Sequence, residues 1–526
     1  MSSETIINWL DEVDDEISDA ESIVSDHESE YEQVISEVPE DETDSSEYSS
    51  NETPFPQRRT RSDNIISHLP GVVGSAKIIN SSNPIDFWNI LFYNTMIEKV
   101  TDYTNVKITE LSISYGNTST FTGHTGIIEI KAFIGLLYLC GIFKSGMEDV
   151  GLFATDDTGR DIFRATMSLK RFLFLLSTIR FDNIYDRDDR KESGDRVAPI
   201  SELFQMFLVN SQSNYSTSEY STVDEILVPF RGRCSFRMYM KSKPNKYGLK
   251  VMCLCDAKNH YLYNAFIYCG KNNVPNPKKN ITGDNWFSSI ELITELKRHG
   301  LTYVGTLRKN KRDIPSQIVP NKQTEVNTTK FAFTKDITLL SFVPKNNRYV
   351  LLFSSMHHTN TINLENSKPE IIEFYNQTKV GVDALDQKCA VYSTHRRIRS
   401  WPLVIFYVML DIASVNSRLQ NINSPIPRRK FGIIIGKELI IPHMKRRLLQ
   451  ERLPREIPQI IKRILGDNTV EATQEISSNL NKRRRCCVCP SSKDTKYSNI
   501  CSVCKKTVCK THGVQVSKCV NCMDTE

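Results

Sequence analysis

Four aspartates stand at positions where separate elements of the chain could hold a metal ion between them. Asp224 lies in the strand-like run "TVDEILVPF", and Asp284 stands where a strand gives way to a helical pattern. Asp383 and Asp386 are three residues apart in a helical pattern, hence on one helix face. Carboxylates that converge from three elements suit Mg²⁺, and two such ions promote phosphoryl transfer. A single aspartate is more often a cap or a surface charge, so spacing alone leaves both interpretations open.

Eight of the fourteen cysteines crowd into the last part of the chain, with the spacing of zinc ligands. The ligands fall into four pairs, each separated by two residues: Cys486 and Cys489, Cys501 and Cys504, Cys509 and His512, Cys519 and Cys522. Interleaved pairing, as in cross-brace modules, joins the first pair with the third and the second with the fourth; consecutive pairing is the alternative. Either scheme predicts two structural zinc ions. By spacing alone, a protein-binding module of RING or PHD type is a competing interpretation.

The elements that must position these residues change in type along the chain. Residues 83–213 repeat apolar side chains at three- and four-residue spacing, which predicts helices. Strand patterns follow in "TVDEILVPF", "GLKVMCLCD" and "YLYNAFIYCG", with "DAKNH" as a hairpin turn. Asp284 or Asn285 could cap a helix that ends near Gly300, and "TYVGTLRKN" predicts a further strand. Three β-like pieces between residues 309 and 370 indicate an insertion.

Charge divides the chain into an acidic tail and a basic body. Residues 1–57 carry nineteen Asp or Glu and no Lys or Arg, which leaves 43 acids and 67 bases in the rest, a net charge of +24. The tail has the composition of a disordered segment, whereas the body indicates a polyanionic partner such as nucleic acid. No apolar run reaches the length of a membrane span, about 18 residues. Clustered cysteines without a secretory signal favour a reducing compartment.

Cationic residues lie close to the aspartates in sequence, and as a set they predict contacts with DNA phosphates. The set comprises Arg231, Arg233, Lys250, Arg308, Lys311, Arg312, Arg396, Arg397 and Arg399. Trp401 could stack on an unpaired base, although a core tryptophan before Pro402 at a helix start is an equal interpretation. The run "KRRR" at residues 482–485 fits a nuclear localisation signal or a basic flank.

Four motifs in order resemble those of piggyBac-type DNA transposases: "VDEILVPFRGR", "GDNWF", "GVDALDQKC" and "RSWPLVIFYVMLDIASVNS". The resemblance implies an α+β protein with an RNase H-like catalytic core. In that core Asp224, Asp284 and Asp383 would bind two Mg²⁺ ions, with Asp386 as a further functional acid. It also implies a nuclear enzyme that acts as a homodimer on double-stranded DNA, with no membrane involved. Such enzymes excise an element through hairpin ends and rejoin it at TTAA.

The resemblance and the patterns together predict an order of domains. The order is an acidic tail (1–65), a helical dimerisation and DNA-binding region (66–217), the core in two parts (218–308 and 371–394) around an insertion (309–370), helices that complete the DNA-binding domain (395–465), a basic linker (466–485) and a zinc-binding domain (486–522). The family uses the last domain to bind terminal DNA.

Two departures from the family pattern bear on catalysis. Val380 stands where the family has a second glycine, which matters only if that backbone needs a positive φ. Before Asp284, residues 271–283 form a short Pro- and Asn-rich link where the family has a helix, whose loss would expose apolar sheet surface. The resulting alternative to a transposase is a transposase-derived nuclear DNA- or chromatin-binding protein that no longer cuts.

Overall fold

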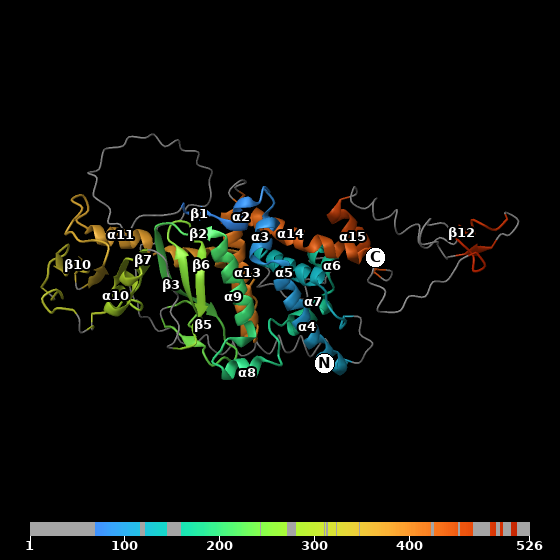
Figure 1. Ribbon diagram of the computed structural model, residues 1–526, viewed down its shortest axis with the longest axis horizontal. Coiled ribbons are helices and arrows are strands. Elements are labelled where there is room, and N and C mark those ends of the chain that lie inside the picture. Colours follow the sequence, from blue (N-terminus) through green and yellow to red (C-terminus); the bar gives the residue numbers. More distant parts are fainter. Residues whose placement is uncertain are drawn as a thin grey trace, which may run out of the picture.

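The protein combines helices with one large mixed sheet and is therefore an α+β protein. The computed structural model describes residues 69–115, 121–144, 159–241, 243–270, 280–309, 311, 314–321, 323–346, 348–421, 426–450, 453–466, 484–490, 495–497 and 507–512. In Figure 1 the large sheet lies towards the left, and most helices of the first and last thirds of the described chain lie to its right.

The sheet has nine strands. From one edge to the other the order is β4 (Met238–Tyr239), β5 (Tyr247–Asp256), β3 (Tyr220–Pro229), β7 (Asn280–Gly283), β8 (Tyr303–Thr306), β11 (Arg348–Ser354), β10 (Thr338–Lys345) and β9 (Thr329–Phe333), with β6 (Leu262–Ile267) paired to β5. The pairs β3–β7 and β7–β8 are parallel, and the other pairs are antiparallel. The strands predicted from "TVDEILVPF", "GLKVMCLCD", "YLYNAFIYCG" and "TYVGTLRKN" are confirmed as β3, β5, β6 and β8.

The helices fall into three groups along the chain. The first group comes before the large sheet: α2 (Gly74–Ile78), α3 (Pro84–Leu91), α4 (Asn94–Tyr115), α5 (Ile127–Ile142), α6 (Asp161–Thr166), α7 (Leu169–Thr178), α8 (Arg187–Glu192) and α9 (Ala198–Ser213). The second group lies between or just after its strands: α10 (Ile290–Arg298), α11 (Glu370–Thr378) and α12 (Gly381–Val391). The third group is α13 (Trp401–Gln420), α14 (Arg428–Arg447) and α15 (Glu456–Leu465). Two small strand pairs, β1 (Gly71–Val72) with β2 (Tyr215–Ser216) and β12 (Arg484–Arg485) with β13 (Lys496–Tyr497), complete the described elements.

Helices cover both faces of the sheet around β3. On one face, Ile226 of β3 belongs to the same buried cluster as Leu385 of α12 and most of the apolar residues of α13. On the other face, Val223 of β3 is buried with Ile293 of α10. Because successive side chains of a strand point to opposite faces, one strand serves both clusters. Residues 224 and 225 are therefore held between two packed layers.

The residues of the predicted insertion enlarge this sheet. Their β-like pieces form β9, β10 and β11, and β11 pairs with β8 through Ser354 opposite Val304. The insertion thus adds three strands on the side of β8 that faces away from β3, and β9 becomes the outer strand.

Close packing joins the helices of the right-hand half. A β-carbon added to Gly135 of α5 would lie 2.8 Å from Gly436 O of α14, so the two helix backbones approach each other directly. A buried ion pair, 2.6 Å between Arg171 Nη2 and Glu129 Oε2, ties α7 to α5. Arg171 also donates to the carbonyls of residues 121, 123 and 124, so its charge is fully compensated within the protein.

Helix α13 runs through the centre of this packing. Among the described residues it is the one helix long and apolar enough to cross a membrane by length and composition, and 72% of that window is buried inside the protein. Its apolar residues contact both the sheet and the neighbouring helices, as those of a core helix do.

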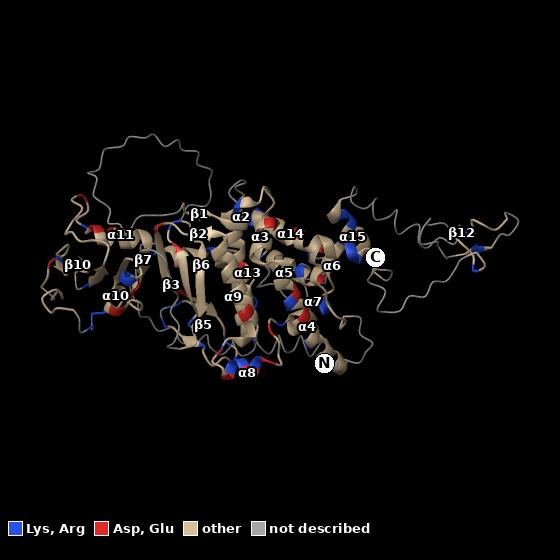
Figure 2. Cartoon of the chain, viewed as in Figure 1, with Lys and Arg blue, Asp and Glu red and all other residues tan. Residues whose placement is uncertain are grey.

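Charged side chains are prominent on two of the helices, α8 and α15 (Figure 2). Figure 2 shows Lys and Arg on α15, and both signs of charge on α8. Part of the basic charge of α15 is engaged within the protein, because Arg463 pairs with Asp161 of α6. A second pair between the same helices joins Arg164 Nη2 to Glu456 Oε2 at 3.1 Å.

Candidate active site

The carboxylates of Asp224, Glu225 and Asp284 come together at the end of β7. Each offers a ligand oxygen, and these oxygens lie within 4.8 Å of one another. The sequence predicted the approach of Asp224 and Asp284. Strand alternation places the Glu225 side chain on the face of β3 opposite to Asp224, and a carboxylate oxygen of Glu225 nevertheless lies within the same 4.8 Å.

The end of β7 explains how Glu225 reaches the cluster. β3 and β7 pair in parallel register up to Val223 opposite Gly283, so Asp284 leaves the sheet beside Asp224. Beyond this pair β7 has ended, and side chains from both faces of β3 can enter the gap that it leaves. Glu225 takes the face opposite to Asp224, towards Lys250 of β5, while its carboxylate still meets the other two.

Crowding and burial raise the pKa of two of these acids. Burial first, and then the charge of Glu225, raise the pKa of Asp224 to about 8, and Asp383 adds to this shift. Burial also raises the pKa of Asp284, with a contribution from Glu225, whereas the charge of Lys250 lowers it. A divalent cation would relieve the same repulsion, and carboxylate oxygens are the ligands that Mg²⁺ prefers. The residues of this cluster therefore fit a magnesium site.

The other two predicted acids lie on α12, which packs on β3 and β5. Asp383 is in the first turn of the helix, and its charge acts on Asp224. Asp386 is one turn further on, where burial raises the pKa of its carboxyl and its charge acts on Cys253 of β5. Neither belongs to the group of ligand atoms within 4.8 Å. The structure thus places the α12 acids next to the cluster, and Glu225 inside it.

The start of α12 is fixed by close contacts with the sheet. A β-carbon added to Gly381 would lie 2.5 Å from Thr222 Oγ1 of β3, so only glycine allows this approach. Thr222 Oγ1 donates to Thr378 O at 2.5 Å, and Thr378 Oγ1 is hydrogen-bonded to Thr282 Oγ1 of β7 at 2.8 Å. The φ of Val380 is −78°, so a glycine is not needed there.

The loop that carries Asp284 is not the start of a helix. Helix α10 is capped by Ser289, whose hydroxyl accepts a hydrogen bond from Leu292 N at 3.1 Å, so the expected cap by Asp284 or Asn285 is wrong. Asp284 Oδ1 instead accepts from Trp286 N at 2.8 Å. The aspartate therefore stays at the strand end, beside Asp224.

Two of the cations predicted to bind DNA hold this loop from outside. Arg308 Nε donates to Asn285 Oδ1 at 3.1 Å, and Lys311 Nζ donates to Ser288 O at 2.8 Å. A third, Lys250, is 3% exposed, and its ammonium is turned towards Glu225 and away from solvent. Arg312 lies outside the described residues.

The other predicted cations lie in two segments that touch each other. They are Arg231, Arg233, Arg396, Arg397 and Arg399. A β-carbon added to Gly232 would lie 2.9 Å from Arg399 O, so segment 231–233 packs against segment 396–399. Of the five, Arg396 is partly buried and the other four are exposed. Two basic segments far apart in sequence thus form one surface.

Asp411 of α13 anchors the second of these segments. Its carboxylate accepts hydrogen bonds from Thr394 N at 2.8 Å and from Ser393 Oγ at 2.7 Å. Burial raises the pKa of Asp411 to about 7, although these hydrogen bonds and the charge of Arg396 lower it. A buried acid therefore holds the turn from which the arginines follow.

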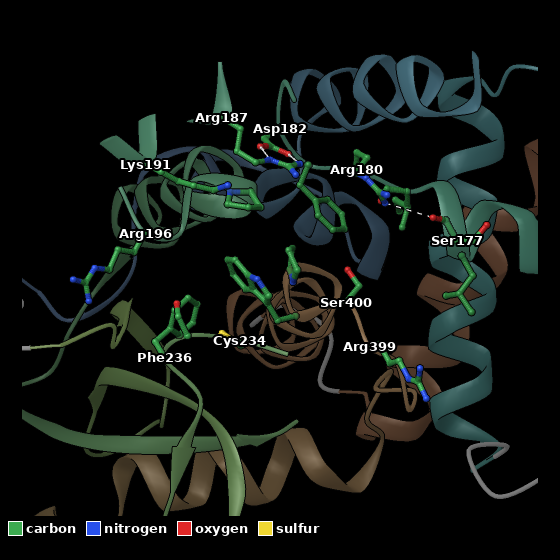
Figure 3. Close-up of a pocket in the computed structure, with 17 residues that line it drawn as sticks. Ser177, Arg180, Asp182, Arg187, Lys191, Arg196, Cys234, Phe236, Arg399 and Ser400 are labelled. Carbon is green, nitrogen blue, oxygen red and sulfur yellow. Dashed lines mark hydrogen bonds and ion pairs between the residues drawn. The ribbon is translucent and has the colours of Figure 1, made fainter. Parts of the chain in front are cut away.

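A pocket of about 660 Å³ lies beside this surface, between helices α7 and α8 and the start of α13. Five cationic residues line it: Arg180, Arg187, Lys191, Arg196 and Arg399. In Figure 3 Arg187 and Lys191 lie on one side of the pocket and Arg399 on the other, and Asp182 binds Arg187 with two hydrogen bonds of 2.7 and 2.6 Å. Trp401 lines the pocket and also meets Phe236 edge to face, 5.0 Å between ring centres. This tryptophan therefore packs against Phe236 and also faces the pocket.

A second cluster near the C-terminus also suits a metal ion. The ligand atoms of Cys486, Cys489, Cys509 and His512 lie within 4.8 Å of one another, as the interleaved pairing predicts for its first site. Burial by itself raises the pKa of the Cys486 thiol, but hydrogen bonds from backbone N–H groups outweigh it and lower the pKa to about 5. Three thiols and one imidazole at this spacing are a ligand set for zinc. The predicted ligands of the second site, Cys501, Cys504, Cys519 and Cys522, lie outside the described residues.

Comparison with known proteins identifies the class. The family model described as Transposase IS4 matches residues 83–280 and 272–418, which is more than half of the chain. The chain therefore belongs to this family of transposases.

Within that family the chain is of the piggyBac type. A cryo-EM structure of a piggyBac transposase synaptic complex with hairpin DNA is 31% identical, with a TM-score of 0.72, over 86% of this chain and 100% of that chain. The human piggyBac transposable element-derived protein 3 is 22% identical over 357 residues, which are 60% of this chain and 58% of that protein. The human chimeric ERCC6-PGBD3 protein is also 22% identical over 357 residues, 32% of its own length. The chain thus spans less than two thirds of either human relative.

The two segments of the family match meet in the link between β6 and β7. Residues 271–279 lie outside the described residues, and with them most of the region where we expected a helix to be lost. On either side of this link the sheet is buried: all four residues of β7 are buried, and Met252 and Leu254 of β5 are 0% and 2% exposed. The apolar sheet surface expected to be exposed is therefore buried at these positions.

Sequence reasoning did not assign Glu225 and Trp286 to this site. Lys250 contacts both, with its Nζ 3.6 Å from Glu225 Oε2 and 4.3 Å from the centre of the Trp286 ring. A signal was present in "GLKVMCLCD", where Lys250 interrupts an otherwise apolar strand. A lysine at such a position needs partners for its charge inside the protein.

Proposed function

We propose that this chain is a cut-and-paste DNA transposase with an RNase H-like core, in which Asp224, Asp284 and Asp383 hold two Mg²⁺ ions. The observation that carries this proposal is the acid cluster at the end of β7, in a chain similar to a transposase solved with hairpin DNA. Bound Mg²⁺ would activate the attacking oxygen and stabilise the leaving oxygen in phosphoryl transfer. Asp386, one turn after Asp383, would complete the set of functional acids.

The reaction needs a DNA strand to be held across the acids while one oxygen replaces another on phosphorus. In the first step a water oxygen bonds to phosphorus and the bond to the 3′ oxygen breaks, leaving a 3′ hydroxyl and a 5′ phosphate. The freed 3′ hydroxyl then attacks a phosphate of the opposite strand and closes a hairpin, and the flanking DNA leaves with a 3′ hydroxyl of its own. Water opens the hairpin at the same phosphate and frees the 3′ hydroxyl again. That hydroxyl attacks a phosphate of the target DNA at TTAA, and a 3′ oxygen of the target leaves. Strand β3, the end of β7 and helix α12 would keep the carboxylates in place through these steps.

Binding of the DNA is assigned to the surface formed by the two basic segments and the pocket beside it. Arg231, Arg233, Arg397 and Arg399 are exposed there and would contact phosphates. Trp401 lines the same pocket and would offer a ring to an unpaired base. We further propose that the chain acts as a homodimer in the nucleus, and that zinc at the C-terminal clusters builds a domain for terminal DNA.

The test is strand cleavage by the purified full-length chain on a DNA that carries element ends flanked by TTAA. Replacing Asp284→Asn keeps the shape of the side chain and removes a metal ligand, so we expect cleavage to fall by more than about 100-fold. The matched control is Asp188→Asn, because the side chain of Asp188 is 86% exposed on α8. Equal cleavage by wild type and Asp284→Asn would contradict the assignment of the site.

A second candidate is a transposase-derived protein that binds DNA without cutting it. The short link before β7 and the similarity to human piggyBac-derived proteins favour it. In that case the wild type shifts the same DNA in a gel but releases no 3′ hydroxyl, and Asp284→Asn changes neither result. Cleavage and binding assays on one preparation separate the two candidates.

A further inference from the structure

Lys250 is a charged residue inside the sheet. It lies on β5 and is 3% exposed, between neighbours that are apolar on both sides in sequence. Its Nζ lies 3.6 Å from Glu225 Oε2 and 4.3 Å from the centre of the Trp286 ring. Both partners stabilise a buried ammonium, the first by its negative charge and the second by the negative face of its ring.

These two partners belong to the two segments that carry the acids of the cluster. Glu225 follows Asp224 on β3, and the backbone N–H of Trp286 donates to Asp284 Oδ1 at 2.8 Å. Tyr268, just after β6, completes the enclosure, since its ring centre is 5.8 Å from Lys250 Nζ and 5.8 Å from the ring centre of Trp286. One buried cation therefore touches both sides of the gap in which the acids meet.

We propose that Lys250 is a positioning residue of the active site. Its ammonium contacts Trp286, in the loop that carries Asp284, and Glu225 on β3, and so holds this loop against β3. The same contact keeps the Glu225 carboxylate beside Asp224 and Asp284. Glu225 thereby becomes a fourth acid available to the metal. The metal-binding part of this inference rests on the proposed function, whereas the fastening of the loop is a property of the metal-free chain.

The variants that test this role change the charge and the shape of the residue separately. Lys250→Met keeps most of the stem and removes the ammonium, and Lys250→Arg keeps a cation in the same place. The matched control is Lys243→Met. Lys243 Nζ lies 4.0 Å from Glu225 Oε1, so Lys243 pairs with the same carboxylate as Lys250, but the Lys243 side chain is 29% exposed. Trp286→Leu removes the aromatic partner of Lys250. Because Trp286 is 42% exposed, this substitution should disturb folding little while it tests the contact between Lys250 and the ring.

The first readout is hydrogen exchange of the Phe287 amide in the full-length chain without metal. This amide is hydrogen-bonded to Asp284 O at 3.2 Å and so reports on the closed loop. We expect exchange to accelerate by about 10-fold or more in Lys250→Met and Trp286→Leu, since opening the loop exposes this amide. Lys250→Arg and Lys243→Met should stay close to wild type. Unchanged exchange in Lys250→Met, or in Trp286→Leu if the former does not fold, overturns the proposal.

The second readout is Mn²⁺ affinity, measured by titration calorimetry on the same variants. We expect the Kd for Mn²⁺ to rise by about 10- to 100-fold in Lys250→Met, which is the usual effect of losing a residue that orients metal ligands. In Lys250→Arg the Kd should return close to the wild-type value. A lower melting temperature with unchanged Mn²⁺ affinity and unchanged exchange would mean that Lys250 only packs, which overturns the proposal. If the wild type binds no Mn²⁺, the proposed function fails, and hydrogen exchange still decides whether Lys250 fastens the loop.

Discussion

The acid cluster on β3 and β7 and the Cys₃His cluster near the C-terminus both suit a metal, but they are built in opposite ways. The acids stand in the middle of β3 and just after the end of β7, in a nine-stranded sheet that has a buried core on each face. The thiols come from short segments, and two of them, Cys486 and Cys509, are themselves the buried apolar residues there, 6% and 2% exposed. The sheet can therefore form before its metal binds, whereas Cys486 and Cys509 are the only buried apolar residues that the structure describes around the thiol cluster. One metal would serve chemistry and the other folding.

Removal of zinc should produce the largest difference between the two regions. Structural zinc in small modules contributes roughly 10 kcal/mol or more to folding, so a zinc chelator should unfold the segment around residues 486–512. The sheet and helices should keep their thermal unfolding temperature, because their cores do not include this segment. Limited proteolysis with mass spectrometry measures the first effect, and calorimetry the second. If this segment resisted proteolysis in the zinc-free protein, the proposed difference between the acid cluster and the Cys₃His cluster would be wrong.

Gly381→Ala tests the close packing of α12 on β3, which positions the acid cluster. The added β-carbon would lie 2.5 Å from Thr222 Oγ1 and 3.0 Å from Thr222 Cβ, so α12 must move away from β3. We expect a loss of about 3 kcal/mol in the free energy of unfolding, at the upper end for overpacking. Cleavage should also fall, since Asp383 lies on this helix. Gly123→Ala is the control, because an added β-carbon meets no atom within 4 Å there. Equal stability of the two variants would argue against a tightly held site.

Asp224→Asn tests whether the acid cluster opposes folding when it holds no metal. The pKa of Asp224 is about 8 in the folded chain against an ordinary 3.8, so its contribution to stability is complete below pH 3.8 and is lost as the pH rises towards 8. The variant cannot ionise, and we expect it to be more stable than wild type by about 2 kcal/mol at pH 8, with a smaller difference at pH 5. Urea unfolding in the presence of a chelator at both pH values measures this. A variant less stable than wild type at pH 8 would show that the carboxylate supports the fold.

Ser289→Ala should have the smallest effect. The Ser289 hydroxyl caps α10, and loss of such a cap costs about 1 kcal/mol. Because α10 packs on the sheet through Ile293 and Leu296, the helix itself should remain. We expect a slightly lower melting temperature and nearly unchanged cleavage. A large loss of cleavage would mean that the loop of Asp284 depends on the helix start more than the structure indicates.

Much of the architecture could be predicted because each element carries its own pattern. The strands around Asp224 are bounded by turn residues, and Val382 and Leu385 mark the buried face of α12 at helical spacing. The Cys₃His cluster of Cys486, Cys489, Cys509 and His512 could be predicted because ligand spacing is a local property.

The details of the acid cluster could not be predicted because they depend on where one strand stops relative to another. Glu225 reaches the cluster only because β7 ends at Gly283, opposite Val223. The register between two strands that are distant in sequence cannot be deduced from the sequence of either strand alone. The cap of α10 was misplaced by four or five residues for a related reason. Asp284, Asn285 and Ser289 are all good caps, and the strand end decides which of them begins the helix.

The added strands of the insertion give the molecule a convenient place to attach a probe. From β3 to β9 the sheet crosses five strand spacings of about 4.8 Å, so the turn between β9 and β10 lies about 24 Å from Asp224 across the sheet. Thr334 and Lys335 are exposed in this turn, which is closed by a hydrogen bond of 2.8 Å from Thr334 N to Ile337 O. A fluorescent label at Lys335 would be attached to the same sheet as the acids, without contacting them. It could therefore report by energy transfer how far the sheet lies from a dye on a bound DNA end.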